Sequence, residues 1–195
     1  MRRRRKELCM KKQRCVRNEY GERLKATGSR RNLMEHHFYE QIRDLLALHE
    51  VQALKNYRHH IMTTRFQHSL NVSYYNYLLC KLFHLDARSA ARAGLLHDLY
   101  FYDTKQYSRS APKLRHSQYH PMAALDNAMQ LLPMNAREQD MIVKHMWPVT
   151  KQKPQYAETY ILTFVDKYCA LIEFILPQPA RFWGWFRRKA LRSAL

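Results

Sequence analysis

Helix-breaking residues are scarce along this chain, and this scarcity restricts its possible folds more than any other feature. Only four Gly and seven Pro occur among 195 residues, between long runs of Leu, Ala, Met, Tyr and charged residues. Such a composition favours helices joined by short loops and disfavours a β-rich fold. A hydrophobic content of 46% is enough for one substantial core. The sequence therefore predicts a single all-α domain, a bundle of about six to seven helices.

Apolar residues that recur at helical spacing locate the expected helices. The first follows Asn32, and the later ones are expected at about residues 66–84, 87–99, 121–132, 136–145 and 158–176. Thr63 or Thr64, Asp86 and Asn135 are suitable N-caps. Pro121 suits the first turn of a helix, because its missing N–H needs no helical partner there. The polar stretch 103–119 is expected to be a long loop.

Positive charge is concentrated at the N-terminus. The chain carries a formal net charge of +18, and residues 1–31 contain thirteen Lys/Arg against three Glu. We expect residues 1–31 to be a flexible basic tail, residues 32–178 to be the helical domain, and residues 179–195 to be an aromatic and basic segment. The positive charge predicts affinity for polyanions. The possible partners are nucleic acid, an anionic membrane and phosphorylated small molecules. The C-terminal segment could dock on the domain, lie at a membrane or stack on nucleobases.

Cysteine usage and the N-terminal sequence bear on the cellular compartment. The four Cys show no CxxC spacing, and two of them lie in the basic tail. No apolar region of a secretory signal follows Arg2 to Arg5. These features predict a reducing, cytoplasmic setting.

Histidine and aspartate occur where the helices should be buried. His97 and Asp98 follow the apolar run Ala-Gly-Leu-Leu, and Asp166 interrupts the run Ile-Leu-Thr-Phe-Val. A buried charge is costly unless it is paired or bound to a metal. His68, His120 and His145 supply one further candidate ligand on each of three other helices. Mixed nitrogen and oxygen donors suit Mn, Fe, Ni, Co or Zn better than Mg or Ca.

Five short segments carry a family resemblance in their order along the chain. They are Arg65-Phe-Gln-His68-Ser, Gly-Leu-Leu-His97-Asp98-Leu, His120-Pro-Met-Ala-Ala, Ile-Val-Lys-His145-Met and Val-Asp166-Lys. This pattern resembles the HD superfamily of metal-dependent phosphohydrolases, in its two-metal form, over about residues 60–175. His116 could replace His120 as a ligand, but only His120 lies in a segment that matches the family.

The resemblance implies a site with two divalent metal ions, of Fe, Mn, Ni, Co or Zn. His68, His97, Asp98 and Asp166 would bind one ion, and His120, His145 and a bridging Asp98 would bind the other. Asp98 would also orient a hydroxide that attacks phosphorus. The resemblance thus implies hydrolysis of a phosphoester or phosphoanhydride in a phosphorylated small molecule, and a nucleotide is the favoured substrate.

The chain departs from the family pattern at position 101, where Phe replaces a common phosphate-binding Lys. Substrate phosphate would then be bound by other residues, for which the candidates are Arg65, Arg115, His116, Lys144 and Lys167. Arg65 could instead orient a carboxylate. Two alternatives stay open. One is a mixed-valence di-iron oxygenase on the same scaffold, and the other is a polyanion-binding module with a regulatory metal site.

Overall fold

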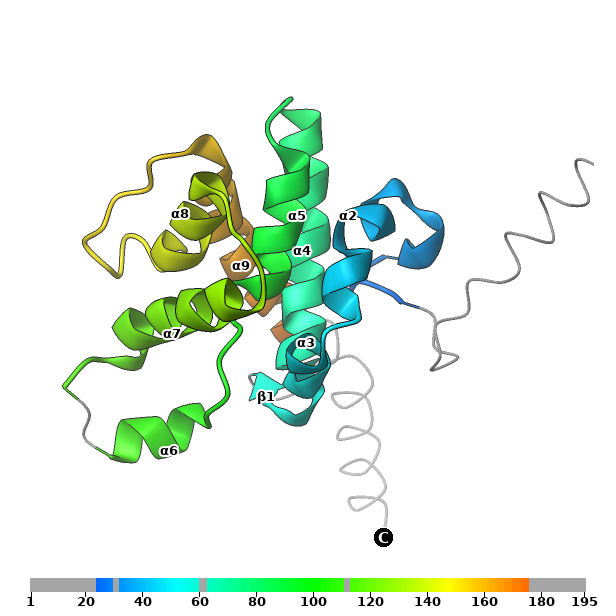
Figure 1. Cartoon of the computed structure of the whole chain (residues 1–195). Helices are drawn as coiled ribbons and strands as arrows, with labels where there is room; N and C mark the ends of the chain where they lie inside the picture. The colour runs from blue at the N-terminus through cyan, green and yellow to red at the C-terminus, as the bar shows by residue number, and fades with distance from the viewer. Residues whose placement is uncertain (1–23, 30–31, 60–62, 111–112, 176–195) are drawn as a thin grey trace, which may run out of the picture.

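Two antiparallel helices form the centre of the molecule. The computed structural model describes residues 24–29, 32–59, 63–110 and 113–175. In it, α4 (Arg65–Leu82) packs most extensively against α5 (Ala87–Leu96) and next against α9 (Ala157–Ile175). Figure 1 shows α4 and α5 side by side, with α2 (His37–Leu46) and α3 (His49–Ala53) on one side and α7 (His116–Leu131) and α8 (Ala136–Lys144) on the other. The predicted all-α class is confirmed.

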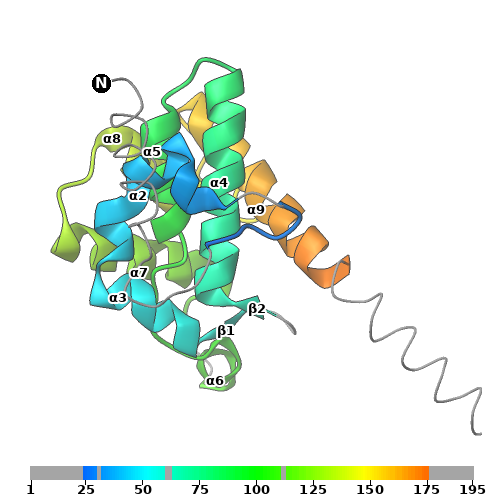
Figure 2. The same ribbon diagram turned by 90° about the vertical axis from the view of Figure 1, so that its right-hand side faces the viewer.

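Short elements complete the described part of the chain. They are η1 (Leu33–Glu35), η2 (Leu54–Asn56), α6 (Thr104–Arg109) and the strands β1 (Arg58–His59) and β2 (Thr63–Thr64). The two strands pair antiparallel, with Arg58 opposite Thr64 and His59 opposite Thr63. Figure 2 shows α9 beside α4, on the side away from α2 and α3. No helix among the described residues is both long enough and apolar enough to span a membrane.

Three helices begin at N-caps that the sequence predicts. The side chain of Thr64 accepts a hydrogen bond from the backbone N–H of Gln67 at the start of α4. Asp86 caps α5, and Asn135 caps α8 in the same way. Each cap satisfies a backbone donor that has no partner within its helix. The predicted caps are therefore confirmed, with Thr64 selected over Thr63.

Small residues on α5 allow it to approach α4 closely. A Cβ atom at Gly94 would lie 2.7 Å from the Cα atom of Ser73, which is too short for any carbon–carbon contact. Near this contact, the Ser73 hydroxyl donates to the carbonyl of Ala91 at 2.6 Å. The side-chain amide of Asn76 donates to the carbonyl of Ala90 at 2.9 Å. Backbone contact thus sets the spacing of the two central helices.

The structure corrects the expected loop at residues 103–119. This stretch contains α6, which Asp103 caps at 2.9 Å from the N–H of Gln106. None of the α6 residues is buried, so this helix lacks the apolar periodicity that would identify it. The next helix, α7, begins at His116, and Pro121 lies inside it rather than in its first turn. A proline inside a helix removes one backbone donor and crowds the preceding turn, and α7 nevertheless continues through Pro121.

The N-terminal part of the described chain packs against the domain. Ala26 lies in the core, and the N–H of Thr27 donates to the Asn71 side chain at 2.9 Å. The Tyr75 hydroxyl donates to the carbonyl of Thr27 at 2.6 Å. The packed region thus includes residues 24–29, which precede the predicted boundary at Asn32. Most of the predicted basic tail and the whole segment 179–195 lie outside the described residues.

Candidate metal centre

Five helices bring the six predicted ligands together. His68 lies in the first turns of α4, His97 is the C-cap of α5, and Asp98 follows it. The other three predicted ligands lie on α7, at the C-cap of α8 and on α9, and they are His120, His145 and Asp166. All are buried except Asp166, which is partly exposed. Residues up to 98 positions apart thus converge inside the bundle.

The first ligand group combines His68, His97 and Asp98. One ligating atom from each lies within 4.8 Å of the others. Asp166 borders this group, because its Oδ1 lies 3.0 Å from Nε2 of His68 and 3.6 Å from Nε2 of His97. Two imidazoles and two carboxylates therefore surround one point, which is a donor set suited to a divalent transition metal.

The second ligand group combines Asp98, His120 and His145, and its ligating atoms also lie within 4.8 Å of one another. The Nε2 atoms of the two histidines are 2.8 Å apart, and Nε2 of His120 lies 3.4 Å from Oδ1 of Asp98. Asp98 belongs to both groups. Buried groups in this part of the chain could therefore hold metal ions on either side of one carboxylate.

The tautomers of three histidines are set by the backbone. Nδ1 of His97 lies 2.8 Å from the carbonyl of Gly94, and Nδ1 of His120 lies 2.8 Å from the carbonyl of His116. Nδ1 of His145 lies 2.7 Å from the carbonyl of Ile142. A carbonyl only accepts, so each Nδ1 carries the proton and each Nε2 presents its lone pair to the centre in the neutral ring. This is how histidine is oriented when it binds a metal.

Two properties of the Nε2 atoms of His97, His120 and His145 are compatible with a bound cation. Nε2 of His97 is buried and has no hydrogen-bond partner among the described residues. Burial lowers the pKa of His145 to about 3 and also lowers the pKa of His120, with mutual repulsion adding to the effect at His145. The two rings are therefore neutral near pH 7, and their lone pairs face each other. A metal ion would give these nitrogen atoms a partner, and the buried residues fit one.

Negative charge predominates around the first group. Burial lowers the pKa of His68, but hydrogen bonds to Asp166 and Glu173 outweigh this effect and raise it to about 10. Burial likewise favours the neutral carboxyl at Asp98 and Asp166, but the neighbouring histidines hold the pKa of both well below the usual range. Both carboxylates are thus ionised and attract a cation, which is either a proton on His68 or a metal ion.

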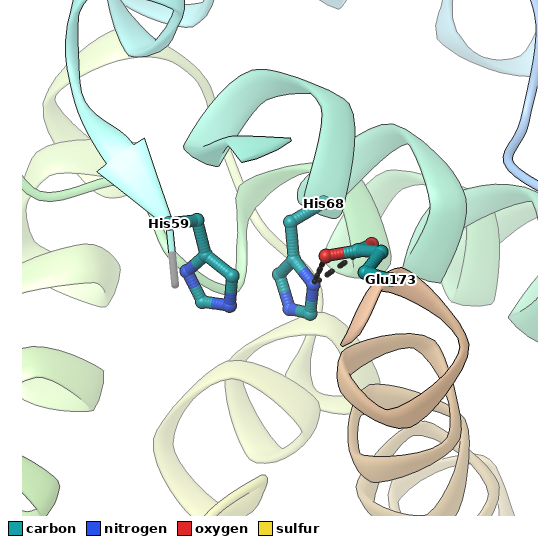
Figure 3. A group of neighbouring side chains, drawn as sticks. All are labelled: His59, His68 and Glu173. Atoms are coloured by element: carbon teal, nitrogen blue, oxygen red, sulfur yellow. Dashed lines mark hydrogen bonds and ion pairs between the residues drawn. The ribbon is translucent and has the colours of Figure 1, made fainter. Parts of the chain in front are cut away.

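Glu173 is a functional candidate that the sequence prediction missed (Figure 3). Its carboxylate accepts a hydrogen bond from Nδ1 of His68 at 3.1 Å, and it also accepts from the Asn71 amide at 2.6 Å and from the Thr63 hydroxyl at 3.1 Å. These contacts direct Nε2 of His68 toward the first ligand group. Glu173 follows Asp166 by seven residues, which places both on one face of α9. An acid two turns after Asp166 in an apolar helix was the signal that could have identified it.

His59 is the second residue that the sequence prediction missed. Its ring stacks on the His68 ring at 3.8 Å between centroids, and its Nδ1 lies 3.7 Å from Oδ2 of Asp98. His59, His68 and Glu173 form a third cluster of ligating atoms within 4.8 Å (Figure 3). The pairing of β1 with β2 positions His59. No periodicity or spacing in the sequence indicates this contact.

Arg65 is buried beside the segment that follows Asp98. Its guanidinium donates to the carbonyls of Tyr100 and Tyr102, and it lies 3.5 Å from the centroid of the Tyr100 ring. These contacts hold the backbone after the His97-Asp98 pair. The arginine therefore orients protein groups in this structure, and a contact with substrate phosphate stays a prediction.

The other four substrate-binding candidates differ in position. His116 stacks on the His120 ring at 4.5 Å, and its Nδ1 is 3.1 Å from the Tyr102 hydroxyl. Lys144 forms an ion pair with Asp140. Lys167 is exposed and donates to the carbonyl of Thr163, and Arg115 is exposed at the start of α7. Only His116 touches a predicted ligand, so the structure does not bring these four residues together.

Comparison of the chain with protein-family models, curated proteins and solved structures finds no match.

Proposed function

We propose that this protein is a metal-dependent phosphohydrolase with a two-metal centre. The observation that carries the proposal is the position of Asp98, which is shared by two buried groups of ligating atoms. The preset histidine tautomers support it, as does Nε2 of His97, which is buried without a hydrogen bond from the described residues. The resemblance of the five ligand segments to the HD superfamily supplies the reaction class.

In this proposal, each protein residue has a defined task. His68, His97 and Asp166 hold one ion, His120 and His145 hold the other, and Asp98 contacts both. Glu173 keeps the His68 ring in place through its hydrogen bond to Nδ1. Divalent ions held there would lower the pKa of a water molecule and polarise phosphoryl oxygens. The substrate is a phosphorylated small molecule, and a nucleotide is the first class to test.

Elemental analysis of the purified full chain tests the metal centre. We expect about two divalent ions per chain after supply of Mn, Fe, Ni, Co or Zn. Asp98→Ala should lose both ions, since this carboxylate belongs to both groups, whereas His145→Ala should lose mainly one. His84→Ala, an exposed histidine at the end of α4, is the control and should keep both. Equal metal loss in all three variants would refute the site.

Phosphate release by the metal-loaded chain tests the reaction. We expect release from phosphomonoesters or nucleotides under anaerobic conditions, and its loss in Asp98→Ala. Activity that needs both iron and oxygen would instead assign the chain to the oxygenase alternative. A chain that binds no metal but binds polyanions in a salt-dependent way would favour the binding-module alternative.

A further inference from the structure

One face of α9 is apolar and faces solvent. Phe164 and Leu171 are 63% and 55% exposed. The remaining large apolar side chains exposed on this helix are Tyr160, Tyr168, Phe174 and Ile175. Spacings of three and four residues place them in one stripe along the helix. A continuous exposed stripe of this kind marks an interaction surface, since isolated apolar residues are the usual case on a protein surface.

The apolar stripe of α9 lies opposite the face that bears the metal centre. Asp166 and Glu173 face α4 on the other side of the helix, where they contact His68. The rings of Phe164 and Tyr168 stack on each other, at 6.3 Å between centroids, rather than inserting into the core. The stripe can therefore be covered by a partner without displacing a predicted ligand.

Charge around the stripe indicates the kind of partner. Lys167 is the only charged residue of α9 in the exposed class, and it lies within the stripe between Phe164 and Leu171. The sequence after α9 also combines aromatic residues with cations, because residues 179–195 contain five Lys/Arg, two Trp, two Phe and no acid. Aromatic and aliphatic side chains mixed with cations are typical of helices that lie at the surface of an anionic bilayer.

A second copy of the chain is the competing occupant, and charge disfavours it. Each chain carries a formal net charge of +18, so association of two copies brings like charges together. An anionic bilayer instead attracts this charge while its interface covers the apolar side chains. We propose that the outward face of α9 docks on an anionic lipid bilayer, with the helix lying along the membrane surface.

Vesicle cosedimentation of the full chain tests this proposal. The probes are vesicles of phosphatidylcholine alone and vesicles that also contain phosphatidylserine. The chain should bind the second kind more tightly, and added salt should weaken this binding. Phe164→Gln combined with Leu171→Gln leaves the charge unchanged and should lower the affinity at least about tenfold, because burial of one large apolar side chain suffices for such a change.

The matched control is Met122→Gln combined with Met129→Gln. These two exposed side chains are also seven residues apart, but they lie on α7. The control should bind as the original chain does, and both double variants should keep the far-UV circular dichroism and the metal content of the original. Equal vesicle binding by both variants, or no binding to phosphatidylserine vesicles, would overturn the proposal. A dimer in solution that only the α9 variant abolishes would assign the face to a second copy instead.

Discussion

At the residue scale, the His68 ring has a carboxylate at each nitrogen. Nε2 lies 3.0 Å from Asp166, and Nδ1 lies 3.1 Å from Glu173. Glu173 is itself held by the Asn71 amide and the Thr63 hydroxyl, so the orientation of the ring depends on a hydrogen-bonded chain of three elements. Carboxylates that bind the outer nitrogen of a ligating histidine fix its tautomer and raise its basicity. In the proposed centre, Glu173 would therefore orient the ligand His68.

We expect Glu173→Gln to weaken metal binding by about 10- to 100-fold, because the amide orients His68 less well and leaves it less basic. The measurement is the dissociation constant for Mn²⁺ or Zn²⁺, obtained by competition with a chelating dye.

Glu158→Gln is the control for Glu173→Gln. Glu158 is a buried acid of the same helix, but it pairs with Arg137 at 2.9 Å and accepts from the N–H of Asp86. This variant should lose stability without a change in metal affinity. If both variants bind metal equally well, Glu173 has no positioning role.

At the element scale, the contact between α4 and α5 determines where His97 lies. Gly94 lies against the backbone of Ser73, and its carbonyl also accepts the hydrogen bond from Nδ1 of His97. One turn of α5 thus sets both the spacing of the central helices and the direction of a predicted ligand. Packing and the candidate metal centre are coupled through this turn.

Gly94→Ala should therefore destabilise the fold by about 1–3 kcal/mol, the usual cost of overpacking a tight interface. The new Cβ would lie 2.7 Å from backbone, which cannot move aside as a flexible side chain can. The free energy of unfolding in urea measures this effect. In an exposed helix, the same change would add stability of up to about 1 kcal/mol, so a more stable variant would contradict the packing argument.

At the scale of the whole molecule, five helices enclose four histidines and two carboxylates. A cation at His68 balances the negative charge of Asp166 and Glu173 beside it. In the metal-free chain, this cation is a proton, because the pKa of His68 is raised from 6.5 to about 10. A raised pKa contributes stability that is fully present below pH 6.5 and is lost as the pH rises through about 10. Metal binding must displace this proton.

The stabilisation by bound metal should therefore grow as the pH rises from about 6.5 toward 10, by up to about tenfold in affinity per pH unit for one released proton. Thermal unfolding of the metal-free and metal-loaded chains across this range provides the measurement. Titrating groups far from the predicted ligands affect both forms alike, so the difference isolates the centre. A difference that shrinks with rising pH would show that His68 is not protonated in the metal-free chain.

The sequence by itself determined the features that depend on the spacing of apolar residues and on the capping of helix ends. The all-α class, the helices now seen as α4, α5, α8 and α9, and the caps Asp86 and Asn135 follow from apolar spacing and side chains that accept backbone N–H groups. The His97-Asp98 pair and Asp166 were identifiable as candidate ligands because charged residues in apolar helices need partners, and the resemblance to the HD superfamily implied the full set of six. Short helices without a buried face, such as α6, carry no such signal.

Only the tertiary structure decided which polar groups meet across the bundle. Glu173 reaches His68 over 105 residues, and His59 reaches it through the pairing of two short strands. Arg65 turned out to hold the carbonyls of Tyr100 and Tyr102, although its sequence position equally suited a contact with phosphate. Spacing along a helix fixes the face on which a residue lies, but its partner depends on how the helices pack. That packing is set by contacts distant in sequence, such as Gly94 on Ser73.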